Sequence, residues 1–114
     1  MSNKDLGNWG EDLAAKFLKK KGYKILARNY RNRFGEIDII ASKKRRIMFI
    51  EVKTRTGNYF GWPEEAVDEK KKEKLEYLAD CYLEEKKFDG DFQFDVISII
   101  KHRGKIDIDY FENI

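Results

Sequence analysis

Two runs of β-branched residues, separated by a short basic turn, constrain the fold of this chain most strongly. The first run extends from Gly35 to Ala41 and the second from Ile47 to Thr54, with the turn expected near 42–45. Two runs of this kind, about four residues apart, predict a β-hairpin. Any fold for the chain therefore has to place this hairpin within a sheet.

Helical and strand patterns on either side of the hairpin predict an α/β fold. Apolar residues recur at spacings of three and four from Asp5 to Lys21, which predicts a helix closed by Gly22. The other expected elements are a strand over 23–30, a loop over 55–62, a helix over 63–87 and strands over 92–100 and 105–111. This α-β-β-β-α-β-β order favours an antiparallel meander and then a helical crossover to a parallel strand. We expect one domain, 1–114, with a mixed sheet of about five strands flanked by helices.

Several functional classes are excluded by what the sequence lacks. No apolar run approaches the roughly 18 residues that a membrane span needs, and the N-terminus lacks the apolar segment of a secretory signal. We therefore expect a cytoplasmic protein without a membrane partner. Cys81 is the single cysteine, expected as a small apolar core residue on a helix, and His102 is the single histidine, expected as an exposed turn residue. Chemistry then has to come from carboxylates, lysines and a metal that prefers oxygen ligands.

Charge is divided unevenly along the chain. Residues 1–62 carry 15 lysines and arginines against 6 acids, a balance of +9, whereas residues 63–114 carry 9 against 15, a balance of −6. This asymmetry favours a basic surface for an anionic partner. The alternative is a solvated surface on which lysines happen to cluster.

Acidic residues interrupt both strands of the predicted hairpin. Alternation of side chains places Glu51 and Lys53 on one face, and the parity of hairpin partners across the turn places Asp38 on the same face. Asp38 is then directly opposite these residues or one diagonal away, about 5 Å or 7–8 Å distant. Glu36 lies on that face as well, nearer the start of its strand.

Carboxylates this close repel each other unless a cation lies between them or one of them keeps its proton. A hard ion such as Mg²⁺ (or Mn²⁺) relieves that repulsion and also binds phosphate oxygens. Lys53 would then hold a phosphate oxygen or orient water, as metal-assisted phosphodiester hydrolysis requires. Glu11, at the border of the first helix's apolar stripe, is a candidate third acid, although a border glutamate is more often solvated. The structural alternative for Asp38, Glu51 and Lys53 is a salt-bridged polar edge of the sheet.

These residues also carry a family resemblance. The segments Gly-Glu-Ile-Asp at 35–38 and Phe-Ile-Glu-Val-Lys at 49–53 resemble the Asp…Glu-x-Lys motif of the restriction-endonuclease-like nuclease superfamily, and most closely that of archaeal-type Holliday junction resolvases. The whole chain resembles the YraN-type bacterial family, from Gly-Glu-Asp-Leu-Ala-Ala at 10–15 to Phe-Asp-Val-Ile at 94–97.

This resemblance implies a restriction-endonuclease-like three-layer fold and a metal-dependent endonuclease acting on branched or structured DNA. It implies metal ligands at Asp38, Glu51 and Glu11 and a catalytic lysine at Lys53, with Glu11 also a catalytic residue. A resolvase-like activity would need two active sites and hence a homodimer. Resolvases of the superfamily often carry glutamine in the helix after the motif, where this chain has Lys70, Lys71, Lys72 and Lys74. The alternative function is a non-catalytic nucleic-acid-binding module that retains the nuclease fold.

Basic side chains flank the motif and are candidates for contacting nucleic-acid phosphates, which supply most sequence-independent affinity. They are Arg28, Arg31, Arg33, Lys43, Lys44, Arg45, Arg46, Arg55 and Lys70. The basic turn at 43–46 has an alternative reading as a charged hairpin tip that resists aggregation. Tyr59, Phe60 and Trp62 could stack on unpaired bases, but more often such residues anchor a loop on the core.

Overall fold

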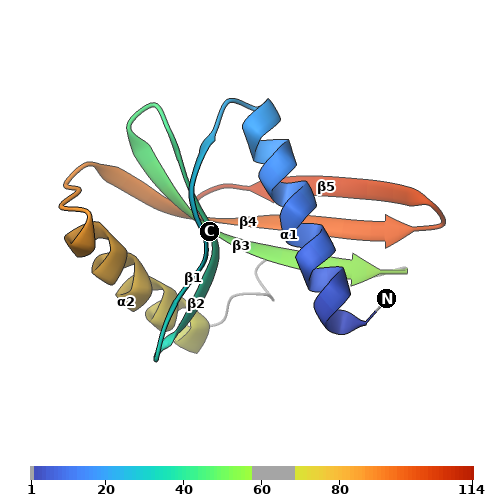
Figure 1. Ribbon diagram of the computed structural model, residues 1–114, viewed down its shortest axis with the longest axis horizontal. Coiled ribbons are helices and arrows are strands. Elements are labelled where there is room, and N and C mark those ends of the chain that lie inside the picture. Colours follow the sequence, from blue (N-terminus) through green and yellow to red (C-terminus); the bar gives the residue numbers. More distant parts are fainter. Residues whose placement is uncertain (1, 58–68) are drawn as a thin grey trace.

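The computed structural model describes residues 2–57 and 69–114 of the chain. Within these ranges, two helices and five strands follow one another in the order α-β-β-β-α-β-β, as the sequence predicts (Figure 1). The elements are α1 (Asn3–Lys20), β1 (Lys24–Asn32), β2 (Gly35–Lys43), β3 (Arg46–Thr56), α2 (Glu69–Glu85), β4 (Asp91–His102) and β5 (Lys105–Phe111). No helix in these two ranges is both long and apolar enough to cross a bilayer.

The five strands form one mixed sheet in the order β1-β2-β3-β4-β5. β3 and β4 pair in parallel from Arg46 opposite Asp91 to Thr56 opposite Lys101, and the other neighbours are antiparallel. A parallel pair needs a long crossover, and α2 lies within it. The predicted antiparallel meander and helical crossover are therefore both confirmed.

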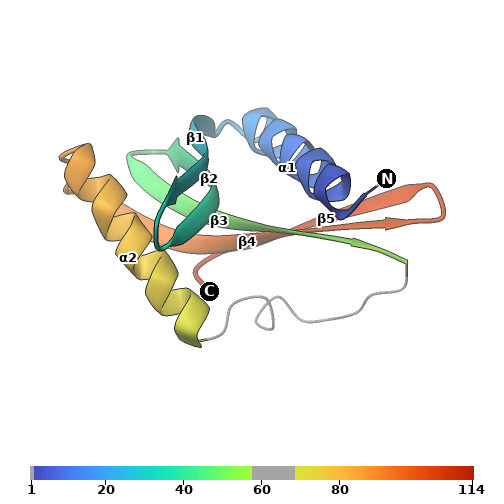
Figure 2. The same cartoon turned by 60° about the horizontal axis from the view of Figure 1, so that its bottom comes forward.

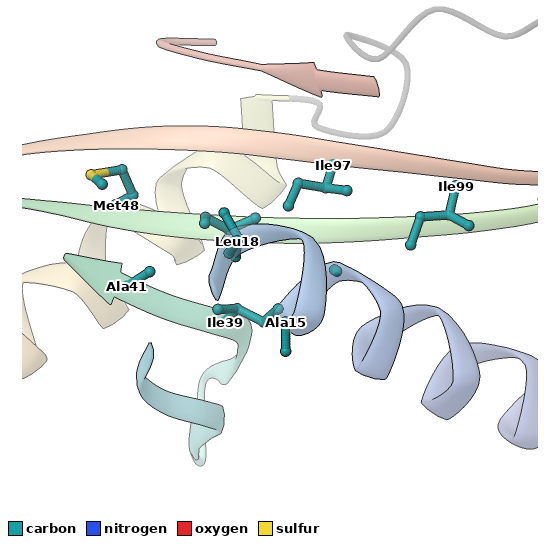
Figure 3. Close-up of a cluster of buried hydrophobic side chains, with 9 residues drawn as sticks. Ala15, Leu18, Ile39, Ala41, Met48, Ile97 and Ile99 are labelled. Carbon is teal, nitrogen blue, oxygen red and sulfur yellow. The ribbon is translucent and has the colours of Figure 1, made fainter. Parts of the chain in front are cut away.

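The two helices cover opposite faces of the sheet, giving three layers (Figure 2). On one face Ala14, Ala15 and Leu18 of α1 pack against β2, β3 and β4 side chains that include Ile39, Met48 and Ile97 (Figure 3). On the other face α2 packs on the opposite side of the same strands. Its buried residues are Leu75, Leu78, Ala79 and Tyr82, which contact a cluster containing Ile37, Ile40, Ile47 and Phe49.

α1 is fixed at both ends and at one point in its middle. Ser2 and Asp5 form a capping box at its start. At its end Gly22 adopts a φ of 89°, its N–H bonds to the Lys19 carbonyl, and the Tyr23 N–H bonds to the Leu18 carbonyl. In the middle, a Cβ on Gly10 would lie 1.9 Å from Thr54 Oγ1 of β3, so only glycine permits this close approach. The contact brings the next residue of α1, Glu11, toward the sheet.

The structure corrects three expectations about residue environments. Residues 55 and 56 belong to β3 and not to a loop, because the parallel partner β4 continues as far as His102 and provides hydrogen bonds for them. His102 is half-buried at the end of β4, where it pairs with Lys105, and is not an exposed turn residue. Cys81 lies on α2, as expected, but is only half-buried. The expected helix start at 63 and residues 58–62 of the expected loop lie outside the described residues.

A buried acid ties the C-terminal segment to the sheet. Asp95 of β4 is 1% exposed and accepts hydrogen bonds from the Tyr110 hydroxyl, the Gln93 side chain and the Asn113 N–H. Burial raises the pKa of Asp95, and these three donors partly offset that rise. The Ile114 N–H also bonds to the Phe94 carbonyl, so this network has a structural role.

Candidate active site at the fork between two strands

The candidate site lies where β2 separates from β3. The two strands pair from Lys43 opposite Arg46 to Ile39 opposite Ile50, and no pair follows in the described structure. Asp38 immediately precedes Ile39 in β2 and has no pairing partner on β3 among the described residues. Its Oδ2 accepts a hydrogen bond from the Val52 N–H at 2.8 Å, so its carboxylate lies in the fork itself.

Side-chain alternation breaks at this position. Ile39 packs in the α1 cluster, yet Ile37, two residues earlier, packs in the α2 cluster with Ile40. A regular strand would direct residues 37 and 39 to the same face. The predicted parity of the hairpin is confirmed by the pairs from Ile39 to Lys43, whereas Asp38 lies just past the regular region to which that parity applies.

Three carboxylates gather at the fork. One oxygen from each of Glu11, Glu36 and Asp38 lies within 4.8 Å of the other two. Glu11 comes from α1, its side chain is 13% exposed, and its buried Oε1 has no hydrogen-bond partner among the described residues. The Arg28 guanidinium is 3.7 Å from that oxygen, and Arg31 pairs with Glu36 at 3.2 Å. Two sequence-predicted ligands, Glu11 and Asp38, are thus brought together.

Glu51 and Lys53 lie next to this cluster and interact with α2. Glu51 is 11% exposed on its side chain, and its Oε1 is 2.6 Å from Lys71 Nζ and 3.8 Å from Lys53 Nζ. Glu51 is therefore ion-paired and is not a member of the three-carboxylate cluster. Lys71 is one of the lysines of α2 that stand where related resolvases often carry glutamine. Like Lys53, it pairs with Glu51.

Burial and mutual repulsion shift the pKa values of these groups. Burial, followed by the negative charge of Glu51, raises the pKa of Asp38 to about 7, although the Val52 N–H opposes this shift. Burial also raises the pKa of Glu11 against the opposing charge of Arg28. Burial and then the charge of Lys71 lower the pKa of Lys53. Burial alone would lower the pKa of Lys71, but the hydrogen bond to Glu51 and the negative charge of Glu51 outweigh this effect and raise the pKa. The burial of closely spaced carboxylates at the fork favours either protonation or a bound cation.

The predicted basic residues divide between two regions. Arg28, Arg31 and Lys70 lie near the fork, since two of them pair with its acids and Lys70 lines the adjoining cleft. Arg33 stacks its guanidinium over the Phe34 ring at 4.9 Å in the same neighbourhood. Arg55, on β3, lies opposite Ile100 of β4.

The turn residues 43–46 lie at the other end of the hairpin, about 17 to 20 Å from Asp38 at 3.3 Å per residue. Lys43 donates from Nζ to the Lys21 carbonyl at 2.7 Å and so closes the end of α1. Arg46 pairs with Asp91 at 3.5 Å. Lys44 and Arg45 form the two-residue turn with positive φ values of 51° and 63°. The structure gives Lys43 and Arg46 structural partners and does not place this turn beside the carboxylates.

Sequence reasoning left Glu36 and Lys71 outside the assigned site. The signal for Glu36 was its proximity to the same hairpin face, and the signal for Lys71 was the basic start of the second helix. The aromatic candidates Tyr59, Phe60 and Trp62 lie outside the described residues.

A sheet with a single parallel pair, one helix on each face and acids at the strand fork make this a restriction-endonuclease-like three-layer α/β fold. Residues 10–99 match the sequence profile described as "Uncharacterised protein family UPF0102", and the chain belongs to this family. A UPF0102 protein of Syntrophomonas wolfei is 47% identical over 112 residues, covering 97% of each chain. One from Fusobacterium nucleatum is 45% identical, covering 100% of this chain and 93% of its own. The expected YraN-type family membership is thereby confirmed.

Proposed function

We propose that the chain is a metal-dependent endonuclease that hydrolyses phosphodiester bonds in branched or structured DNA. The observation that carries this proposal is the convergence of Glu11, Glu36 and Asp38 at the fork, with Lys53 close by on the adjacent strand. Carboxylates and a lysine in this arrangement match the requirements of phosphodiester hydrolysis assisted by a divalent ion.

The donor set fits Mg²⁺ or Mn²⁺. Oxygen ligands about 2.1 Å from an ion lie up to about 4.2 Å from one another, and the three oxygens here lie within 4.8 Å before any adjustment. Glu11 Oε1, which has no hydrogen bond among the described residues and only the ion pair with Arg28 at 3.7 Å, and the raised pKa of Asp38 both indicate a site that gains from a positive charge. Glu11, Glu36 and Asp38 would hold the ion, and Glu51 would join them on leaving Lys71. A bound ion would acidify water and neutralise charge that builds on the phosphate.

Lysines would complete the site. Lys53 is partly buried beside Glu51, and its lowered pKa reduces the cost of losing its proton to solvent, after which the neutral amine would accept a proton from an attacking water. In its charged form the same Nζ would donate a hydrogen bond to a phosphate oxygen. Lys71, released from Glu51, would offer a second cation to the phosphate. The roles of Lys53 and Lys71 follow from their positions, because Lys53 on β3 and Lys71 on α2 both face Glu51.

Substrate preference is proposed from charge and from the family resemblance. Arg28, Arg31, Arg33 and Lys70 surround the acids with positive charge, which suits a nucleic-acid backbone. The similarity to Holliday junction resolvases favours branched DNA and a homodimer that brings two sites to one junction.

The proposal is tested with a labelled four-way junction, a flap and a linear duplex, each incubated with Mg²⁺, Mn²⁺ or EDTA. We expect cleavage that needs the metal and is lost in Lys53→Ala and in Asp38→Asn, while Asp107→Asn on β5, an exposed acid, cleaves normally. Cleavage that survives both site substitutions would contradict the assigned mechanism. Salt-dependent binding without cleavage of any DNA or RNA would instead favour a non-catalytic nucleic-acid-binding module.

A further inference from the structure

A cleft of about 450 Å³ lies beside the fork, between the β1–β2 turn and α2. Such a volume is within the range of ligand sites, about 300–1,000 Å³. Its lining comprises Phe34, Gly35 and Glu36 from the turn and Lys70, Lys71, Lys74, Leu75 and Leu78 from α2. Two of these residues also belong to the site region: Glu36 is one of the three clustered acids, and Lys71 binds Glu51. A ligand in the cleft would thus lie next to the carboxylates.

The cleft combines an apolar wall with a positive rim. Leu75 and Leu78 are buried and provide the apolar wall. Lys70 and Lys74 bring two positive charges to the rim, while Lys71 is paired with Glu51 and the one acid of the lining, Glu36, is paired with Arg31. A ligand that fits this lining has a flat apolar part and at least one negative group.

An exposed aromatic pair borders the cleft. Phe34 is 42% exposed and Tyr77 of α2 is 48% exposed, although large aromatic rings are usually covered. Their rings meet edge to face at 4.7 Å, and the Arg33 guanidinium lies 4.9 Å from the Phe34 ring. The Phe34 N–H donates to Asn32 Oδ1 at 2.8 Å, which fixes the turn. Phe34 is therefore held in place while much of its ring remains available for contact.

We propose that this cleft binds an unpaired nucleotide of a DNA strand, with its base against Phe34 and its flanking phosphates on Lys70 and Lys74. The inference deepens the proposed function and rests on it for the identity of the substrate. Aromatic rings stack on unpaired bases of any sequence, whereas bases inside a duplex are already stacked on both faces. The subsite would therefore select DNA that has an unpaired nucleotide next to the phosphate presented to the fork.

Binding is measured by fluorescence anisotropy in EDTA, so that no metal-dependent cleavage takes place. The probes are a fluorescein-labelled duplex and the same duplex carrying a single-stranded flap. We expect the wild-type protein to bind the flap about tenfold more tightly, in line with the stacking of one base. Equal binding of the two probes by the wild-type protein would overturn the proposal.

Matched variants separate stacking from charge. Phe34→Ala should abolish the preference for the flap and Phe34→Tyr should retain it, with Ile106→Ala, at 46% exposure on β5, as the control. Lys74→Gln should reduce the slope of log affinity against log salt by about 0.7 for single-stranded DNA, whereas Lys105→Gln on β5 should leave it unchanged. A Phe34→Ala variant that is folded by circular dichroism and keeps the full preference would also overturn the proposal.

The failure of this subsite and the failure of the proposed function give different results. Cleavage with Mg²⁺ together with unchanged flap preference in Phe34→Ala would refute the subsite and leave the nuclease proposal standing. Loss of the preference in Phe34→Ala, with no cleavage of any probe, would support the subsite and refute catalysis.

Discussion

Replacing Asp38 with asparagine should make the stability of the protein less sensitive to pH. The substitution removes a negative charge at the fork but keeps nearly the same shape, and an asparagine Oδ1 can still accept the Val52 N–H that now bonds to Asp38. The other fork acids, Glu11 and Glu36, remain in place. Any change in the pH profile therefore reports the carboxyl group of residue 38.

The expected magnitude follows from the raised pKa. In the folded protein burial and the charge of Glu51 raise the pKa of Asp38 from 3.8 to about 7. A folded-state pKa above the unfolded value means that the folded protein binds the proton more tightly than the unfolded chain does. The free energy of unfolding of the wild-type protein therefore decreases as the pH rises from 4 to 7. The full interval corresponds to about 4 kcal/mol. Asparagine avoids this loss, but burying its NH₂ without a partner costs about 1–3 kcal/mol.

These values predict that the two stability profiles cross. At pH 8 we expect Asp38→Asn to be more stable than wild type by about 2 kcal/mol, or about 8 °C in Tm. At pH 4, where Asp38 is protonated in the folded protein, the same variant should be less stable by about 1–3 kcal/mol. Thermal unfolding by circular dichroism from pH 4 to 8, at fixed ionic strength in EDTA, measures both.

Two controls complete the experiment. Asp107→Asn removes a charge from the exposed surface of β5 and should shift the profile by less than about 0.5 kcal/mol at any pH. Mg²⁺ at a hundred times its dissociation constant should stabilise the wild-type protein by about 2.7 kcal/mol and the Asp38→Asn variant far less. Parallel profiles for wild type and Asp38→Asn would refute the reasoning, because they would show that residue 38 does not titrate between pH 4 and 8.

Two further predictions concern the contacts that hold the sheet layers together. Gly10→Ala should lower stability by about 1–3 kcal/mol and reduce cleavage, because the new Cβ would lie 1.9 Å from Thr54 Oγ1, whereas Gly7→Ala meets open space and should stabilise the helix; equal effects at the two glycines in thermal unfolding would contradict this. Tyr110→Phe removes a donor to buried Asp95 and should cost about 2 kcal/mol. The pKa of Asp95 is already raised and would rise further without this donor, so ionised Asp95 would destabilise the variant most at high pH. The decrease in the free energy of unfolding, measured with urea, should therefore be larger at pH 8 than at pH 4, and equal decreases would contradict the assigned role of Asp95.

The hairpin and its parity could be predicted from sequence because they depend on local features. Two β-branched runs and a short turn restrict the register to pairs in which one residue number is odd and the other even. The observed pairs, from Ile39 opposite Ile50 to Lys43 opposite Arg46, obey that restriction. The alternation along β3 likewise placed Glu51 and Lys53 together. These predictions required no knowledge of the rest of the chain.

The make-up of the acid cluster depends on long-range packing and could not be predicted in the same way. Glu36 joins the cluster where β2 is separated from β3, before Ile39, although β2 stays paired with β1; regular alternation does not include this separation. Glu51 pairs instead with Lys71, which is 20 residues distant in the chain. The close contact of α1 with β3 at Gly10 likewise could not be predicted, because the crossing point of a helix on a sheet is set by tertiary packing.

The parallel pairing of β3 with β4 has a consequence for how the molecule folds. Arg46 and Asp91, which begin this pairing, are 45 positions apart, so closing it costs more chain entropy than forming any of the three antiparallel hairpins. Contacts of such long range generally form late and slow the overall rate. We therefore expect the β1–β3 meander to assemble early with its acids facing one another, and the partner of Glu51 on α2 to arrive only as the crossover closes. A chain that stopped before α2 would contain all four predicted catalytic residues, Glu11, Asp38, Glu51 and Lys53, yet the ion pair between Lys71 and Glu51 would be missing.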